Sequence, residues 1–110
     1  GGGGGGGGGG EEGGSGPPIV AGPGSAGVGY LTPVMTTQRN GELQFINLDV
    51  VQHDVVSDEK APDGAPLFST PLIGTGQSAP VTGLDRVEAG KSYGFFCSLH
   101  TNMRGTLTVR

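Results

Sequence analysis

The residues best able to do chemistry are concentrated in one stretch near the C-terminal end of the sequence, residues 97–103. It contains the only cysteine, Cys97, one of the two histidines, His100, and one of the two methionines, Met103. A thiolate, an imidazole and a thioether are ligands for a soft metal ion, and spacings of three residues let a tight loop point all of them at one centre. We therefore interpret this stretch as most of a metal site, and the second histidine, His53, as the remaining ligand.

The mixture of sulfur and nitrogen ligands favours copper. Cu(I) prefers sulfur whereas Cu(II) prefers nitrogen, so an ion that changes valence quickly needs both kinds of ligand. Two imidazoles and one thiolate in a plane, with a weak thioether on the axis, meet that requirement. Zinc would accept the cysteine and both histidines, but a structural zinc site requires a fourth hard or thiolate ligand and does not use a thioether. One redox-active copper ion is therefore predicted.

Other interpretations of the same residues remain open at this point. A lone cysteine in a strand is more often a small buried hydrophobic residue than a ligand, and His53 by itself would more often be a turn or surface residue. A nucleophilic pair of Cys97 and His100 needs an oriented base with its own partner, and it would leave Met103 and His53 without a role. Met35 is a competing thioether, but it has no ligand neighbours and is predicted to pack in the core.

The composition changes abruptly along the chain. Ten consecutive glycines open the sequence, and a stretch rich in glycine and proline follows them. Polyglycine has no side chains to bury and loses the most backbone entropy on ordering, so it cannot join a core. We expect residues 1–24 to be a flexible tether, a tag or a placeholder for unassigned sequence, and residues 25–110 to form one small domain.

The overall charge and the single cysteine narrow the class of protein. A formal net charge of −4 argues against a nucleic-acid ligand, whose binders need a basic face. One cysteine rules out an internal disulfide, so a small domain must gain its extra stability from its core or from a metal. No run is long enough for a membrane-spanning helix, and the tether is compatible with export and with a membrane anchor upstream.

Short segments rich in β-branched and aromatic residues, separated by turn residues, predict an all-β fold. Pro33 indicates an edge strand or a bulge, and the prolines and glycines of residues 58–80 indicate a long connection. No segment carries a sustained helical period, so an antiparallel sandwich or barrel is predicted. A Greek-key topology would bring His53 to the same end of the fold as Cys97. Strands are expected at residues 28–37, 43–51, 53–57, 81–82, 84–88, 92–97 and 105–110.

Two segments carry a family resemblance. Residues 92–100, with the sequence SYGFFCSLH, closely resemble the copper loop of plastocyanin-type blue copper proteins, the cupredoxins. The Cys-x-x-His-x-x-Met spacing, continued by Arg104 and Gly105, is most similar to the amicyanin branch. Upstream, FINLD at residues 45–49 and HDV at residues 53–55 are similar to the family's strand and first-histidine motif. The resemblance implies a cupredoxin-like Greek-key β-sandwich of about eight strands with a type 1 copper site.

The resemblance also assigns the ligands by position. It implies that the backbone carbonyl of Gln52 lies where some relatives make a distant fifth contact. The four ligands that it implies are His53, Cys97 and His100 in the equatorial plane and Met103 on the axis.

Further residues around the ligands follow from the same match. Asp54 stands where many relatives have an asparagine that ties the two ligand loops together, and Ser98 is the residue next to the cysteine. An ionised aspartate can accept such hydrogen bonds but cannot donate them. A carboxylate near the ion would favour Cu(II), so we expect a lower reduction potential than in an Asp54→Asn variant. Leu99 and His100 lie where the family docks its partners.

The resemblance implies an electron-transfer protein and not an enzyme. Such a protein passes one electron between redox partner proteins through transient contacts, and we expect it to be a monomer outside the cytoplasm, in the periplasm or at the outer face of a membrane. Three other functions remain open. They are a module of a larger copper enzyme or respiratory complex, a copper storage or delivery module and, from the fold pattern alone, a non-metal adhesion sandwich.

Overall fold

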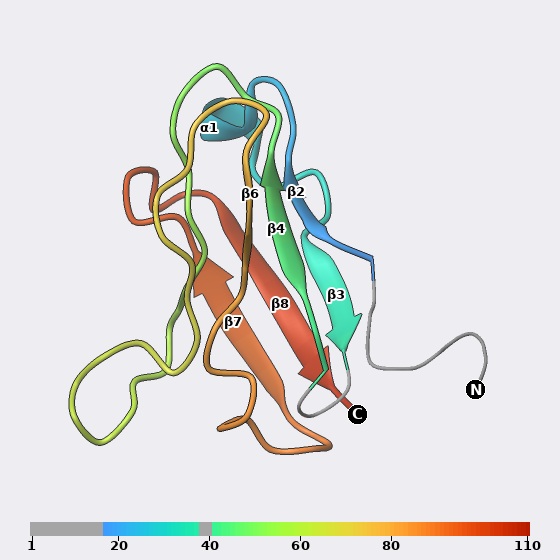
Figure 1. Cartoon of the computed structure of the whole chain (residues 1–110), viewed down its shortest axis with the longest axis vertical. Coiled ribbons are helices and arrows are strands. Elements are labelled where there is room, and N and C mark those ends of the chain that lie inside the picture. Colours follow the sequence, from blue (N-terminus) through green and yellow to red (C-terminus); the bar gives the residue numbers. More distant parts are fainter. Residues whose placement is uncertain (1–16, 38–40) are drawn as a thin grey trace.

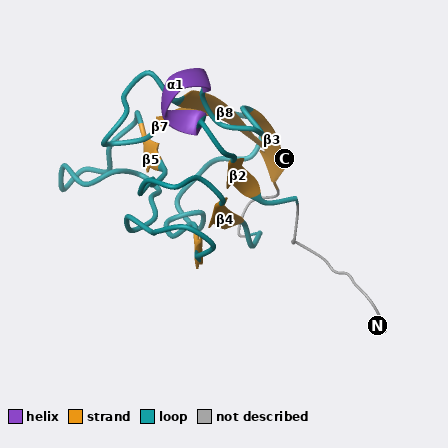
Figure 2. Ribbon diagram, turned by 90° about the horizontal axis from the view of Figure 1, so that it is seen from above, coloured by secondary structure: helices purple, strands orange, loops and turns teal. Residues whose placement is uncertain are grey.

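The computed structural model describes residues 17–37 and 41–110, and this part of the chain folds into a β-sandwich (Figures 1 and 2). The all-β expectation is confirmed; the described residues hold seven strands, where the resemblance implied about eight. One short helix, α1 (Ser25–Val28), was not expected. The strands are β2 (Ile19–Ala21), β3 (Val34–Thr37), β4 (Gln44–Asn47), β5 (Val56–Ser57), β6 (Ser78–Pro80), β7 (Ser92–Phe96) and β8 (Arg104–Val109).

The strands form two sheets. One has the order β2-β4-β6 and the other the order β3-β8-β7-β5. The β7 and β8 strands pair antiparallel, whereas β3 lies parallel to β8 at the edge of its sheet. Of the two alternatives predicted from Pro33, an edge strand or a bulge, the structure shows the edge strand. Proline has no N–H to donate to a ladder and is therefore tolerated there.

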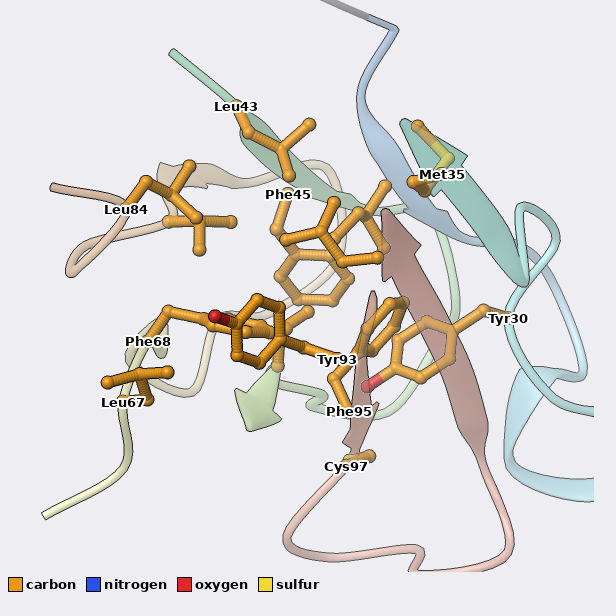
Figure 3. Close-up of a cluster of buried hydrophobic side chains, with 14 of the residues drawn as sticks. Tyr30, Met35, Leu43, Phe45, Leu67, Phe68, Leu84, Tyr93, Phe95 and Cys97 are labelled. Carbon is orange, nitrogen blue, oxygen red and sulfur yellow. The ribbon is translucent and has the colours of Figure 1, made fainter. Parts of the chain in front are cut away.

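The core lies between the two sheets and is built by the side chains that alternate inward. Tyr93, Phe95 and the following Cys97 are all buried on the same side of their strand, as the sequence alternation predicted. Tyr30 contacts the rings of Phe45 and Phe95 edge-on, with centroids 6.2 and 5.1 Å apart, and so connects the two sheets. In Figure 3, Cys97 lies at one end of this aromatic cluster. The metal-binding loop thus begins directly on the core.

Several expected strands are wrong in extent: those at 28–37 and 53–57 are observed only at Val34–Thr37 and Val56–Ser57, and residues 81–82 form no strand. Local hydrogen bonds explain two further differences. The strand expected at 43–51 ends at Asn47, because the Asn47 side-chain oxygen accepts the Asp49 N–H at 2.9 Å and turns the chain. Val50 is consequently 86% exposed. No regular strand forms at 84–88, because Gly83 has a φ of 101° and its carbonyl accepts the Arg86 N–H at 3.0 Å in a turn. The neighbouring β6 strand lies instead in the segment expected to be a connection.

The expected tether falls mainly outside the described residues, which begin at Pro17. Within its described part, Ile19–Ala21 forms β2 and pairs with β4. Ile19 and Ala21 are fully buried. These residues therefore form an edge strand of the three-stranded sheet, although the expected boundary of the domain was residue 24.

The loops that carry the predicted ligands meet at one end of the sandwich. The loop at 97–103 joins β7 to β8 at the end opposite the C-terminus (Figure 1). The loop that contains His53 follows β4 and leads to β5, and so passes from one sheet to the other. The sheets thus deliver residues that are distant in sequence to one place.

Candidate metal centre

His53, Cys97 and His100 converge on a single point. One ligand atom of each residue lies within 4.8 Å of the other two. The Sγ atom of Cys97 is 3.7 Å from Nδ1 of His53 and also 3.7 Å from Nδ1 of His100. The two imidazole rings have centroids 4.9 Å apart and are tilted by 55°. The structure therefore brings the second histidine to the C-terminal loop, as predicted.

Backbone hydrogen bonds shape the loop between β7 and β8. The His100 N–H donates to the carbonyl of Cys97 at 3.2 Å, and the Met103 N–H donates to the carbonyl of His100 at 2.8 Å. The Cys97 N–H donates to the carbonyl of Met103 at 3.1 Å and closes the loop. Two successive four-residue turns, 97–100 and 100–103, therefore return the cysteine and the histidine to the same side.

The distances from the Cys97 sulfur to the two imidazole nitrogens fit a small first-row metal ion. Distances of about 2.3 Å to sulfur and about 2.0–2.1 Å to nitrogen are typical of such ions in proteins. With angles between tetrahedral and trigonal, these lengths place sulfur and nitrogen roughly 3.6 to 3.8 Å apart. The observed separations of 3.7 Å from Cys97 Sγ to both nitrogens lie within this interval. The sulfur of Cys97 therefore lies at a suitable distance from each imidazole nitrogen to share an ion with it.

His53 is held from two sides. Its N–H donates to the carbonyl of Ile73 at 3.2 Å, and the Ile73 N–H donates back to the His53 carbonyl at 3.0 Å. Its Nε2 atom lies 2.7 Å from Oδ2 of Asp49, and both side chains are almost fully buried. The hydrogen bond from His53 is the main reason why the pKa of Asp49 lies well below its usual range, with further help from the N–H of Gly24. The remaining nitrogen, Nδ1, faces Cys97.

Asp54 ties the two ligand loops together, as the resemblance implied for this position. One carboxylate oxygen accepts the Ser98 N–H at 2.7 Å, and the other accepts the Ser98 hydroxyl at 2.6 Å. The Tyr30 hydroxyl donates to the backbone carbonyl of Asp54 at 2.6 Å. Asp54 directly follows His53, and Ser98 directly follows Cys97. These hydrogen bonds therefore fix the two loops relative to each other.

Burial controls the ionisation of the groups at the base of the site. Removal from water raises the pKa of the Cys97 thiol, because a thiolate in an apolar setting loses its hydration. Burial also raises the pKa of Tyr30 far above its usual range, and the nearby Cys97 and Asp54 add to this effect. In the metal-free protein Cys97 is therefore a thiol, and binding a metal there releases a proton.

The other predicted residues have clear places in the structure. Met103 is completely buried at the closing end of the loop, and Met35 packs in the core, as predicted. Leu99 is 53% exposed, and Gln52 is exposed beside His53. The axial role of Met103 and the contact from the Gln52 carbonyl stay predictions.

Sequence reasoning missed two residues that hold the site. Asp49 was noted only as the end of a family motif, although its spacing of four residues before a candidate ligand histidine was a usable signal. Tyr30 was unassigned, because nothing in its surroundings of glycine and proline indicated a contact with Asp54. Both contacts depend on the fold of the loops.

The comparison with known families decides the identity of the fold and cofactor. Residues 19–110 match the sequence model of the family described as copper binding proteins, plastocyanin/azurin family. The chain belongs to this family. Copper is therefore the cofactor of this cupredoxin, in agreement with its sulfur and nitrogen ligands.

Solved structures agree with this assignment of the fold. The novel purple cupredoxin from Nitrosopumilus maritimus is 23% identical, with a TM-score of 0.67, and the match covers 84% of this chain and 98% of that one. The reduced Cu(I) form of an amicyanin variant at pH 4 is 26% identical, with a TM-score of 0.63, and the match covers 84% of this chain and 81% of that one. No curated protein matches the chain in sequence. No helix in the described part of this cupredoxin is long and apolar enough to cross a membrane.

Proposed function

We propose that this cupredoxin transfers single electrons and holds one copper ion in a type 1 site. His53, Cys97, His100 and Met103 would hold the ion, and the Gln52 carbonyl would lie near it. When bound, copper supplies the exchange of one electron between the Cu(I) and Cu(II) states. The observation that carries this proposal is the convergence of one sulfur and two imidazole nitrogens within 4.8 Å.

The surrounding residues keep the ligands in place in both valence states. The bonds from Ser98 to Asp54 and from Ile73 to His53 fix the two ligand loops to each other and to the sheet. Because the ligands are held before the metal binds, little reorganisation accompanies a change of valence. Low reorganisation favours fast electron exchange and supports a role in transfer.

His100 is the proposed exit for the electron. Of the three converging residues it is the only one that is partly exposed, since His53 and Cys97 are fully buried. Leu99 precedes it and is 53% exposed. A partner that covers Leu99 would therefore contact the His100 ring edge.

Apolar residues from several segments gather around this exit, and we call them the docking face. Hydrogen bonds place the segments beside one another: the Asn102 side chain donates to the carbonyl of Ala26, and the Gly24 N–H donates to Asp49. The docking face consists of Val28, Val50, Val51, Leu72 and Leu99, each between 42% and 86% exposed.

The docking face is uncharged. Within the described segments 23–30, 48–52, 72–76 and 98–102 the only carboxylate is Asp49, which is buried. A small apolar surface fits redox partner proteins that bind and leave quickly. The proposed protein is a monomer, acts outside the cytoplasm as cupredoxins typically do, and performs no substrate chemistry.

The copper site is tested by adding Cu(II) to metal-free protein and recording the visible spectrum beside that of Cys97→Ser. We expect an intense blue or green thiolate-to-copper band that disappears in the variant. A wild-type sample that stays colourless with excess Cu(II) would contradict the proposal.

Electron transfer is tested separately, by the rate of electron self-exchange between reduced and oxidised copies of the loaded protein. Fast exchange supports a carrier. Slow exchange together with a readily lost metal would indicate storage or delivery of copper instead.

A further inference from the structure

We propose that Asp49 is a positioning residue of the copper site, which fixes the ring of His53 so that Nδ1 is the ligating atom and strengthens this histidine as a donor to Cu(II). The inference rests on the copper site proposed above. Asp49 contacts the far side of the ring and is not itself a ligand.

The contact between the two residues determines which nitrogen carries the proton. Oδ2 of Asp49 lies 2.7 Å from Nε2 of His53, and their side chains are 4% and 0% exposed. A carboxylate can only accept a hydrogen bond, so Nε2 must carry the hydrogen. A neutral imidazole protonated at Nε2 has its lone pair on Nδ1, the atom that faces Cys97 Sγ at 3.7 Å. The pairing therefore leaves the correct atom free for the metal.

The carboxylate is itself fixed by its surroundings. Its second oxygen, Oδ1, accepts the N–H of Gly24 at 3.0 Å and the N–H of Val50 at 2.8 Å. The Thr75 hydroxyl donates to the backbone carbonyl of Asp49 at 2.6 Å. The carboxylate therefore cannot turn away from His53 without losing the hydrogen bonds from Gly24 and Val50, and the Thr75 bond holds the backbone of the same residue.

Asparagine at this position cannot reproduce the arrangement. Its side chain has one accepting oxygen and one donating NH2 group. If the oxygen faces the N–H groups of Gly24 and Val50, the NH2 group faces Nε2 of His53 and requires the proton on Nδ1. If the oxygen faces His53, the NH2 group meets two backbone donors and both of their hydrogen bonds are lost. The first arrangement puts the proton on Nδ1 and blocks this ligand atom, whereas the second leaves Nδ1 free but loses the hydrogen bonds that hold the side chain against His53.

The expected effect on the metal follows from this contact. Loss of a hydrogen-bonding partner behind a ligating histidine typically lowers metal affinity by about 10- to 100-fold. A carboxylate partner raises the basicity of the imidazole, so the loss should fall more heavily on Cu(II) than on Cu(I). A selective tenfold loss of Cu(II) affinity corresponds to a rise in the reduction potential of about 59 mV for one electron.

The first measurement uses the metal-free wild-type protein. Nitrogen-15 NMR of labelled histidine reads the tautomer of His53 directly, and we expect the proton on Nε2. A proton on Nδ1 in the wild-type protein would overturn the proposal without any variant. Failure of the wild-type protein to bind copper would instead refute the proposed function, so the two failures are distinguishable.

The second measurement compares variants by tautomer, by Cu(II) and Cu(I) affinity, and by reduction potential. Asp49→Asn should populate the Nδ1-protonated tautomer, bind Cu(II) about 10- to 100-fold more weakly and have a higher potential. Thr75→Val is the matched control, because it removes a hydrogen bond from the same loop and leaves the carboxylate in place. Asp49→Glu retains a carboxylate and should keep the wild-type tautomer. Equal tautomer and Cu(II) affinity in Asp49→Asn and Thr75→Val would show that the carboxylate does not position His53.

Discussion

Asp54 uses both oxygens of its carboxylate to hold Ser98, a residue 44 positions further along the chain. The backbone N–H and the hydroxyl of Ser98 are the two donors, and each of the two residues directly follows a proposed copper ligand. Asp54 is only 6% exposed, so its negative charge is buried beside the metal centre. The same carboxylate connects the two ligand loops. The connection and the charge can be separated by mutation.

Asp54→Asn should raise the reduction potential while the loops stay connected. The asparagine oxygen can accept the Ser98 N–H, and its NH2 group can donate to the Ser98 hydroxyl oxygen. Removal of the charge removes a preference for Cu(II) of about 1 kcal/mol, or roughly 40 mV. Redox titration measures the shift, with the exposed Asp85→Asn as control. Potentials that are equal to or below the wild-type value would show that the Asp54 carboxylate does not favour Cu(II).

Met103→Leu should keep the thiolate-to-copper band and shift the potential upward, because a weak axial thioether tunes the potential without carrying the band. Leucine has a similar volume, so the buried position should lose less than about 1.5 kcal/mol of folding free energy. The control is Met35→Leu, the same substitution at a core methionine, which should leave the potential unchanged. Loss of the band in Met103→Leu, or equal shifts in both variants, would argue against an axial role for Met103.

Leu99→Asp should slow electron self-exchange by at least about tenfold at low ionic strength. Two copies that meet through the docking face would place like charges opposite each other, which costs several kcal/mol when they are close. Added salt should recover part of the rate by screening, whereas the wild-type rate should depend little on salt. Val34→Asp is the control, because Val34 is 72% exposed on the edge strand β3. A similar slowing in the Val34→Asp control would show that the two copies do not meet specifically through Leu99.

The buried phenol of Tyr30 should link stability to alkaline pH. Its pKa is raised above the value of about 10 expected in the unfolded chain, so the folded state holds this proton more tightly. The stabilisation is complete below about pH 10 and declines as the pH rises further. Tyr30→Phe should lose about 1 kcal/mol near pH 7, because the Asp54 carbonyl loses its hydrogen bond, and should remove this alkaline decline.

This prediction is checked by denaturant unfolding of metal-free protein from about pH 7 to about pH 11, a range that includes the usual pKa of a phenol. A Cys97→Ser background is required, because burial also raises the pKa of the thiol and would add its own decline. Tyr93→Phe is the control that keeps Tyr30. An equal alkaline decline in the Tyr30→Phe protein would assign the effect to another group.

The sequence identified the ligands because their chemistry is rare in this chain. With one cysteine and two histidines available, His53 and Cys97 could be paired without knowledge of the fold. The strand that ends in Cys97 was equally clear, since alternate side chains face the core and the structure keeps that alternation. Both features could be predicted because they depend only on which side chains are present and on how they alternate along the strand.

The remaining features depend on contacts between distant segments. The end of β4 at Asn47 follows from a side-chain hydrogen bond that replaces a strand continuation. The pairing of Ile19–Ala21 with β4 follows a stretch whose composition resembles a linker. The link from Tyr30 to Asp54 joins residues 24 positions apart, and it exists only where the segment after α1 packs on the core. None of these contacts leaves a periodic signal in the sequence.

The bond from the Cys97 N–H to the Met103 carbonyl continues the ladder of β7 and β8 into the copper-binding loop. A slip of this hairpin by one residue would turn Cys97 from the inner to the outer face of its sheet. The thiolate-to-copper absorbance therefore reports the register of β7 and β8, because a chain that binds copper through Cys97 has already paired these two strands correctly. In a refolding experiment on this protein, the return of absorbance would mark that alignment without any added label.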